Sequence, residues 1–280
     1  FTMRDGWLAL DEMCGLKDLE RHGWIWTGEA GMHRHRTTDE SQQREFKPMS
    51  LLNVYGDQCT VLSANKGPDI ATQRADDLDQ ASVRYAKEHP GRALDVGCGA
   101  GGQAARLAGV GAHATGLDMP ELADAFSEHM ALSQAQYGDA WGRGDFVGSN
   151  MLEIPAAWLD EHAHAFSQIT CQRAIHYVRR EQAVALLVQL RGVLANEGKL
   201  FISCSGLHSE LGQGYDAGSL PPDERFGMLA PEMQDKHQIK QPVCLYSQDE
   251  FAQMLAQAGW RIDTIYASSF GNIKAIASKE

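Results

Sequence analysis

The sequence lacks closely paired cysteines. Its cysteines are Cys14, Cys59, Cys98, Cys171, Cys204 and Cys244. No two of them form the C-x-x-C pattern that is typical of zinc sites and thiol redox sites. Their scatter also gives no disulfide framework of the kind found in small secreted domains. We therefore expect no metal site and no disulfide scaffold, and we expect the protein to reside in the cytoplasm.

The sequence also lacks a basic surplus and a long apolar run. It has 25 Lys and Arg against 37 Asp and Glu, a net charge of −12. Proteins that bind along the phosphate backbone of a nucleic acid need clustered basic side chains, so we expect no extended nucleic-acid-binding surface. Because no apolar stretch approaches the roughly 20 residues that cross a bilayer, we expect no membrane contact. A small or neutral substrate fits this composition better.

The most informative segment is A-L-D-V-G-C-G-A-G-G at residues 93–102. An apolar strand carries Asp95 near its end and leads directly into Gly97, Gly99 and Gly101. Glycine permits positive φ and lets the backbone approach a ligand closely. A helix that begins near Gly101 adds unpaired N–H groups at its start. The segment therefore predicts a site for a nucleoside-like cofactor.

Two cofactor classes compete for this site. Gly97, Gly99 and Gly102 also satisfy the G-x-G-x-x-G spacing of nicotinamide dinucleotide enzymes. Asp95 favours S-adenosylmethionine, because a carboxylate there attracts a sulfonium or an ammonium group and repels a pyrophosphate. Asp118 ends the next apolar strand, where an acid accepts the ribose hydroxyls of either cofactor. A nicotinamide-dependent dehydrogenase therefore remains the alternative.

A third segment makes a family resemblance specific. Residues 145–155 read D-F-V-G-S-N-M-L-E-I-P, a short strand followed by a polar turn. Together with the D-x-G-x-G-x-G loop and the acid after the second strand, this turn resembles the class I S-adenosylmethionine-dependent methyltransferases. The resemblance implies S-adenosylmethionine as the cofactor, held by Asp95, Gly97, Gly99, Gly101, Asp118, Met119, Asn150, Met151 and Cys171. Asn150 stands where the family more often has Asp, and its amide oxygen can still accept a hydrogen bond from the adenine amine.

Strand-like and helix-like segments alternate from about residue 93 onward, which predicts a doubly wound parallel sheet. The expected strands are 93–97, 112–117, 144–148, 166–171, 199–204, 261–267 and 272–277. The resemblance implies that the last two form an antiparallel hairpin at the sheet edge. The expected fold is therefore α/β, with a mostly parallel seven-stranded sheet of the Rossmann-like methyltransferase type, an N-terminal helical extension and a lid insertion.

Two helices can be located by their local patterns. Val184, Leu187, Leu190 and Leu194 predict one apolar face of a helix over 180–196, with Gly198 as its stop. Ser247 and Glu250 form a capping-box pattern at the start of another helix.

The chain is expected to have two parts, and the second part contains an insertion. Residues 1–90 form an N-terminal helical or cap segment that ends in a helix over 71–89. The aromatic residues Trp7, Trp24, Trp26 and Tyr55 in this segment either wall the substrate or form simple core. Residues 91–280 form the S-adenosylmethionine-binding domain. Within it, residues 207–241 read as a lid-like insertion, since long loops in compact domains are often functional.

The segment after the fourth strand should carry the acceptor site. It lacks the Asp/Asn-Pro-Pro-Tyr turn of amino-methylating nucleic-acid enzymes. The C-Q-x-x-x-H-Y pattern of Cys171, Gln172, His176 and Tyr177 instead resembles messenger-RNA cap guanine-N7 methyltransferases. His176 is the catalytic candidate, orienting or deprotonating a hydroxyl acceptor, and its alternative role is structural. Gln172, Tyr177, His208 and Tyr215 are candidates for substrate binding.

These observations predict a methyltransferase that acts on a small-molecule or nucleobase-like acceptor. An RNA-end methyltransferase of the cap guanine-N7 type is one alternative. A non-catalytic S-adenosylmethionine-binding module is the other.

Overall fold

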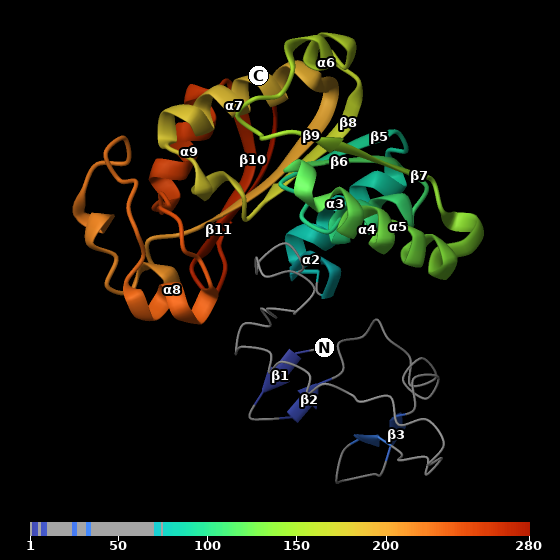
Figure 1. The fold of residues 1–280 in the computed structure, drawn as a ribbon, viewed down its shortest axis with the longest axis horizontal. Coiled ribbons are helices and arrows are strands. Elements are labelled where there is room, and N and C mark those ends of the chain that lie inside the picture. Colours follow the sequence, from blue (N-terminus) through green and yellow to red (C-terminus); the bar gives the residue numbers. More distant parts are fainter. Residues whose placement is uncertain (1, 5–6, 10–23, 27–31, 35–69, 74) are drawn as a thin grey trace. The chain divides into compact units, whose positions relative to one another are not determined.

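The computed structural model describes residues 2–4, 7–9, 24–26, 32–34, 70–73 and 75–280 (Figure 1). The chain divides into two units, Phe1–Met49 and Ser50–Glu280. The described elements of the first unit are strands that pair antiparallel, β1 (Thr2–Arg4) with β2 (Trp7–Ala9) and β3 (Trp24–Trp26) with β4 (Met32–Arg34). Trp7, Trp24 and Trp26 lie in these strands, and aromatic residues favour extended backbone. Tyr55 lies outside the described residues.

The second unit is built on a seven-stranded sheet with the order β10-β11-β9-β8-β5-β6-β7 (Figure 1). Its strands are β5 (Arg92–Val96), β6 (His113–Asp118), β7 (Arg143–Gly148), β8 (Phe166–Gln172), β9 (Leu194–Ser205), β10 (Trp260–Ala267) and β11 (Asn272–Lys279). Strands β5 to β9 pair in parallel, and β11 pairs antiparallel with both β9 and β10. The predicted mostly parallel seven-stranded sheet and its antiparallel hairpin are confirmed.

Helices cover both faces of this sheet (Figure 1). The described helices of this unit are α2 (Ile70–Gln73), α3 (Asp77–Glu88), α4 (Gly102–Ala108), α5 (Ala123–Tyr137), α6 (Ala156–Glu161), α7 (Arg180–Val193), α8 (Pro231–His237), which belongs to the 207–241 insertion, and α9 (Gln248–Gln257). Successive strand residues point to opposite faces. Ala93 therefore joins a core with residues of α3, α4 and α5, whereas Leu94 joins a core with residues of α6, α7 and α9.

Local patterns located α9 correctly and α7 only in part. The Ser247–Glu250 capping box is confirmed, since each side chain accepts a hydrogen bond from the other's backbone N–H. The expected end of α7 near residue 196 is wrong, because the helix stops at Val193 and Leu194 already pairs with Phe166 of β8. Sheet pairing of the fully buried Leu194 overrides the helical pattern that included it.

The residues expected to form a lid are ordered by their own small core. Leu211, Tyr215, Leu229, Val243 and Leu245 pack together there. The Arg225 guanidinium, 5% exposed, makes two hydrogen bonds to the Glu250 carboxylate at 2.7 and 2.9 Å and so ties the insertion to α9.

The strand order reverses at β5, whose neighbours are β8 on one side and β6 on the other. In open α/β sheets, ligands bind at the carboxyl ends of strands beside such a switch point. In the described part of the chain, no helix has the length and apolar character needed to cross a bilayer.

Candidate functional site

The turn after β5 is shaped by glycines. Gly97, Gly99 and Gly101 have φ of +70°, +55° and +85°, the region that side chains disfavour. A Cβ on Gly97 would lie 2.5 Å from the Cβ of Ala174, so the first glycine also lets the turn pack against the segment after β8. The predicted glycine turn therefore lies at the switch point, between the ends of β5 and β8.

Asp95 is buried at this junction, 4% exposed. Burial raises the pKa of its carboxyl to about 7, opposed by a 2.7 Å hydrogen bond that the Thr170 hydroxyl donates to Oδ1 and by the Ala104 backbone N–H. Among the described residues, no hydrogen bond of normal geometry reaches Oδ2. An unpaired buried carboxylate oxygen is costly unless a donor arrives. The residue therefore fits a ligand that brings an ammonium group.

Asp118 joins the end of β6 to the glycine turn. Its Oδ2 accepts the Gly99 N–H at 2.8 Å and its Oδ1 accepts the Met119 N–H at 2.7 Å. Burial raises the pKa of this carboxyl, and the two N–H bonds lower it. Each oxygen keeps a further lone pair, so the oriented carboxylate can still accept ribose hydroxyls. The Met119 side chain is 43% exposed beside it.

Asn150 lies in the turn after β7, the strand beside β6, at the same carboxyl-terminal edge of the sheet as Asp118. Its Oδ1 accepts the Leu152 N–H at 3.0 Å, and this bond fixes the side chain in a local turn. The Ser149 N–H is held by the Asp118 carbonyl at 2.8 Å. Met151 is partly buried against the sheet core. Asp118 is the last residue of β6 and pairs with Gly148, the last residue of β7, so Asn150 lies two residues beyond the corresponding strand end.

The last residues of β8 face inward. The Cys171 side chain is fully buried in the core, which raises its pKa to about 12. The Gln172 amide donates to Oδ1 of Asp79, at the start of α3, and its Oε1 accepts from the Ser203 hydroxyl at 3.3 Å. Both ends of the Gln172 amide are thus used inside the protein.

His176 is 2% exposed in a short turn after β8. Burial, with a smaller effect from the cation of Arg173, lowers the pKa of its imidazole to about 3. The Ser205 N–H faces Nδ1 of His176 at 3.5 Å, and the backbone carbonyl of His176 accepts the Cys244 N–H at 2.8 Å. A neutral, enclosed imidazole favours the structural role. The Tyr177 ring packs beside it, with the centroids 4.3 Å apart.

The two remaining substrate candidates lie in different surroundings. Tyr215 is buried in the insertion core, where its hydroxyl donates to the Val243 carbonyl at 2.5 Å. His208 is exposed and lines a shallow depression with Glu210 and Phe270, between the end of β9 and the β10–β11 turn.

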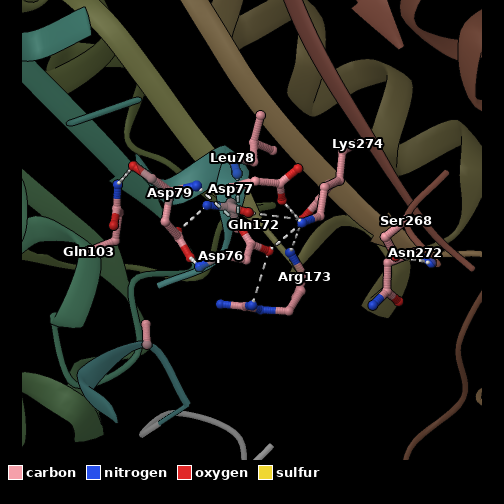
Figure 2. Close-up of polar contacts among 12 residues, drawn as sticks. Asp76, Asp77, Leu78, Asp79, Gln103, Gln172, Arg173, Ser268, Asn272 and Lys274 are labelled. Atoms are coloured by element: carbon pink, nitrogen blue, oxygen red, sulfur yellow. Dashed lines mark hydrogen bonds and ion pairs between the residues drawn. The ribbon is translucent and has the colours of Figure 1, made fainter. Parts of the chain in front are cut away.

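Sequence reasoning missed a charged network beside the glycine turn (Figure 2). Asp76 and Asp79 form a reciprocal capping box at the start of α3. The Lys274 ammonium, on β11, lies 2.8 Å from Oδ2 of Asp76. Arg173, directly after β8, lies 3.7 Å from the same oxygen. Its position two residues after Cys171, the predicted end of the fourth strand, was the one available sequence signal.

Together, these residues, which we call the cradle, have the features that a nucleoside cofactor requires. In the described ranges, no group of His, Cys, Asp and Glu side chains has the arrangement of a metal site. The cradle instead offers positive-φ glycines, an oriented carboxylate at Asp118 and an unpaired carboxylate oxygen at Asp95. Such a set fits a nucleoside that carries an amino-acid group.

We compared this chain with families of known proteins. A family model described as a methyltransferase domain matches residues 70–265. Among curated protein sequences, no significant match is found.

Several solved structures share the fold. A magnesium protoporphyrin IX methyltransferase from Synechocystis with bound SAH is 16% identical, with 72% of this chain and 82% of that chain covered and a TM-score of 0.51. A SAM-dependent methyltransferase from Methanosarcina mazei is 20% identical over 68% of this chain and 92% of that chain, with a TM-score of 0.52. The 1,6-didemethyltoxoflavin-N1-methyltransferase of Burkholderia thailandensis, with its acceptor and S-adenosylhomocysteine bound, is 16% identical over 72% and 78%, with a TM-score of 0.50.

Proposed function

The chain belongs to the methyltransferase domain family and is an S-adenosylmethionine-dependent methyltransferase, and we propose that its acceptor is a small molecule bound beside the 207–241 insertion. The main support for this cofactor position is Oδ2 of Asp95, which is buried beside the glycine turn and has no hydrogen-bond partner among the described residues. The resemblance seen in the sequence, which implied this cofactor, is confirmed at the level of the family.

The chain's own residues divide the binding work. Asp95 receives the ammonium of the methionyl group, Asp118 receives the ribose hydroxyls, and Asn150 with the Met151 N–H faces the adenine. When bound, S-adenosylmethionine supplies an electrophilic methyl group on a sulfonium. The protein's contribution is to hold an acceptor in line behind that methyl group, since positioning alone supplies much of the rate in such displacements.

The acceptor proposal is supported by charge and by the insertion. The net charge of −12 disfavours an extended polyanion. The insertion has its own core and two bonds to α9, so it offers a fixed wall. Two of the structural neighbours are named for small acceptors, magnesium protoporphyrin IX and 1,6-didemethyltoxoflavin.

His176 has a positioning role in this proposal. Its ring is enclosed, and its backbone carbonyl accepts the Cys244 N–H, so it fixes the segment after β8 against the segment around Cys244 that follows the insertion. Proton removal from a hydroxyl acceptor then falls to another group or to water.

Calorimetric titration tests the cofactor assignment. We expect S-adenosylmethionine and S-adenosylhomocysteine to bind, NADH not to bind, and Asp118→Ala to abolish the binding. Asp139→Ala, which removes an exposed carboxylate elsewhere, is the matched control. Binding of NADH alone contradicts the assignment.

Acceptor screening tests the proposal that the acceptor is a small molecule. Release of S-adenosylhomocysteine is measured with panels of small heteroaromatic and phenolic compounds and with capped RNA oligonucleotides. Turnover confined to small molecules supports the proposal. Turnover confined to capped RNA replaces it with the RNA-end alternative, and cofactor binding without any turnover favours a non-catalytic module.

A further inference from the structure

Arg173 holds an unusual place beside the cofactor cradle. Asp95 of β5 and Thr170 of β8 are register partners, and β8 continues to Gln172, so Arg173 is the first residue past the strand end. The next residue, Ala174, is the one that a Cβ on Gly97 would strike. Arg173 therefore leaves the sheet directly against the glycine turn, at the switch point of the strand order.

The backbone of Arg173 is held in a conformation that arginine disfavours. Its φ is +56°. Its N–H donates to the Ser203 carbonyl at 3.0 Å and faces the Ser203 hydroxyl at 3.2 Å. Residues kept at positive φ by their surroundings are concentrated at functional sites. The β9 residue Ser203 thus fixes where the Arg173 side chain begins.

Within the described part of the chain, the ion pair of the Arg173 guanidinium with Asp76 is longer than a hydrogen bond. Its Nη1 is buried without a hydrogen-bond partner among the described residues. The nearest carboxylate oxygen, Oδ2 of Asp76, is 3.7 Å away, beyond hydrogen-bond distance. Figure 2 draws Lys274 and Arg173 on opposite sides of Asp76.

Asp76 is already engaged. Its Oδ1 accepts the N–H groups of Leu78 and Asp79 at 2.9 and 3.0 Å, and its Oδ2 lies 2.8 Å from the Lys274 ammonium. The pKa of the Asp76 carboxyl is lowered by these partners against the opposing effect of burial. Its capacity is used by α3 and β11, so Arg173 keeps a donor for another anion.

Two atoms of oppositely charged groups, Oδ2 of Asp95 and Nη1 of Arg173, therefore lie at neighbouring strand ends, each without a hydrogen-bond partner among the described residues. An α-amino acid carries an ammonium and a carboxylate on one carbon. Arginine is the side chain that best matches a carboxylate in geometry. We propose that Arg173 binds the methionyl carboxylate of S-adenosylmethionine while Asp95 binds its ammonium. The inference rests on the methyltransferase function described above.

The test compares ligands that differ only at the amino-acid end. S-Adenosylhomocysteine, its carboxamide and 5′-methylthioadenosine are titrated calorimetrically into wild type and Arg173→Gln. We expect the substitution to weaken S-adenosylhomocysteine about 10- to 100-fold and to leave methylthioadenosine, which lacks the amino-acid group, unchanged. The carboxamide should bind the wild type weakly, with no further loss in the variant.

The matched control is Arg84→Gln, which removes one exposed cation from α3 and should leave all three affinities unchanged. Equal loss of S-adenosylhomocysteine and methylthioadenosine in Arg173→Gln overturns the inference, as does no loss of either. Unchanged S-adenosylhomocysteine affinity with a raised KM for an acidic acceptor assigns Arg173 to the acceptor instead, and also overturns it.

Folding of the variant does not decide the outcome. Circular dichroism melts establish whether Arg173→Gln is folded, and the carboxamide tests the wild type with no substitution at all. Full affinity of the wild type for the carboxamide overturns the inference. A wild type that binds none of the three ligands contradicts the cofactor assignment itself, and the inference falls with it.

Discussion

The hydroxyl of Thr170 donates a 2.7 Å hydrogen bond to the carboxylate of Asp95, across the junction of β8 and β5. Among the described residues, Thr170 is the one side chain that donates a hydrogen bond to this carboxyl, whose pKa burial raises to about 7. Because hydrogen bonding favours the charged form, Thr170 keeps Asp95 able to ionise near neutral pH. The relationship connects the sheet register to the charge that the cradle presents.

The affinity for S-adenosylhomocysteine should rise with pH through about 7. An ammonium ligand prefers the ionised Asp95, which is depleted below its pKa. We expect the affinity to fall several-fold from pH 8 to pH 6 and Asp95→Asn to be weaker and pH-independent over this range. Calorimetry at each pH measures it. Thr170→Val should move the midpoint to higher pH, and an unmoved midpoint contradicts the role given to this hydroxyl.

The ligand-free protein should become more stable when Asp95 loses its charge. The folded-state pKa is raised above the unfolded value of 3.8, so this group's contribution is present below pH 3.8 and is lost as pH rises toward 7. At pH 8 we expect Asp95→Asn to unfold with a free energy higher by on the order of 2–4 kcal/mol. Urea unfolding at pH 4 and pH 8 checks this. A difference that is equal at both pH values excludes the linkage, and Asp139→Asn is the exposed control.

His176 should make the protein sensitive to acid. Its folded-state pKa of about 3 lies below the ordinary histidine value of 6.5, so the stability it contributes is present above pH 6.5 and is lost as pH falls toward 3. By pH 5 the loss amounts to about 2 kcal/mol. His176→Gln should unfold with a flatter pH dependence between 6.5 and 4. An imidazole that titrates near pH 6.5 in the native state by NMR contradicts the burial argument.

Gly97→Ala should weaken cofactor binding about tenfold or more, because φ is +70° and the new Cβ would lie 2.5 Å from the Cβ of Ala174. Gly192→Ala is the matched control. No atom of the described residues lies within 4 Å of a Cβ there, and the residue is in α7, so we expect stability to rise by roughly 0.5–1 kcal/mol with affinity unchanged. Calorimetry and thermal melts of both variants distinguish the two effects.

Arg225→Met should loosen the insertion. The change removes two hydrogen bonds to Glu250 and bonds to the carbonyls of Leu220 and Leu245. Breaking one side of such a pair costs about 3 kcal/mol, and limited proteolysis between residues 207 and 246 should accelerate. Lys240→Met breaks an exposed pair with Asp235 and should change little. Equal cleavage rates for the two variants exclude a special role for Arg225.

The glycine turn and the position of Asp118 could be predicted from short sequence motifs, whereas the charged residues around them could not. Gly97, Gly99 and Asp118 act through backbone conformation and position at a strand end, which short motifs encode. The network around Asp76 joins residues nearly the whole domain apart, since Lys274 also contacts Asp77 from 197 positions away. No periodicity reports such a pairing, and the same applies to Arg173, whose unpaired donor depends on Lys274 occupying Asp76.

Burial was the other property that the sequence concealed. His176 and Tyr215 are polar residues of the kind found in catalytic and substrate-binding sites. The sequence near them does not indicate that Tyr215 is buried in the insertion core or that His176 is buried beside the segment around Cys244. The end of α7 was misplaced for a related reason, because Leu194 fits a helical face and a strand equally well until β8 supplies its partner.

The position of β11 has a consequence for how the chain assembles during synthesis. This strand follows all others of the sheet in sequence, yet it lies between β9 and β10. As the chain leaves the ribosome, β10 has no neighbour to join until β11 arrives, and the Asp76–Lys274 contact is equally delayed. Nascent chains therefore carry an open sheet edge at β9 until the last strand closes it, and this is the interval in which chaperones would find them.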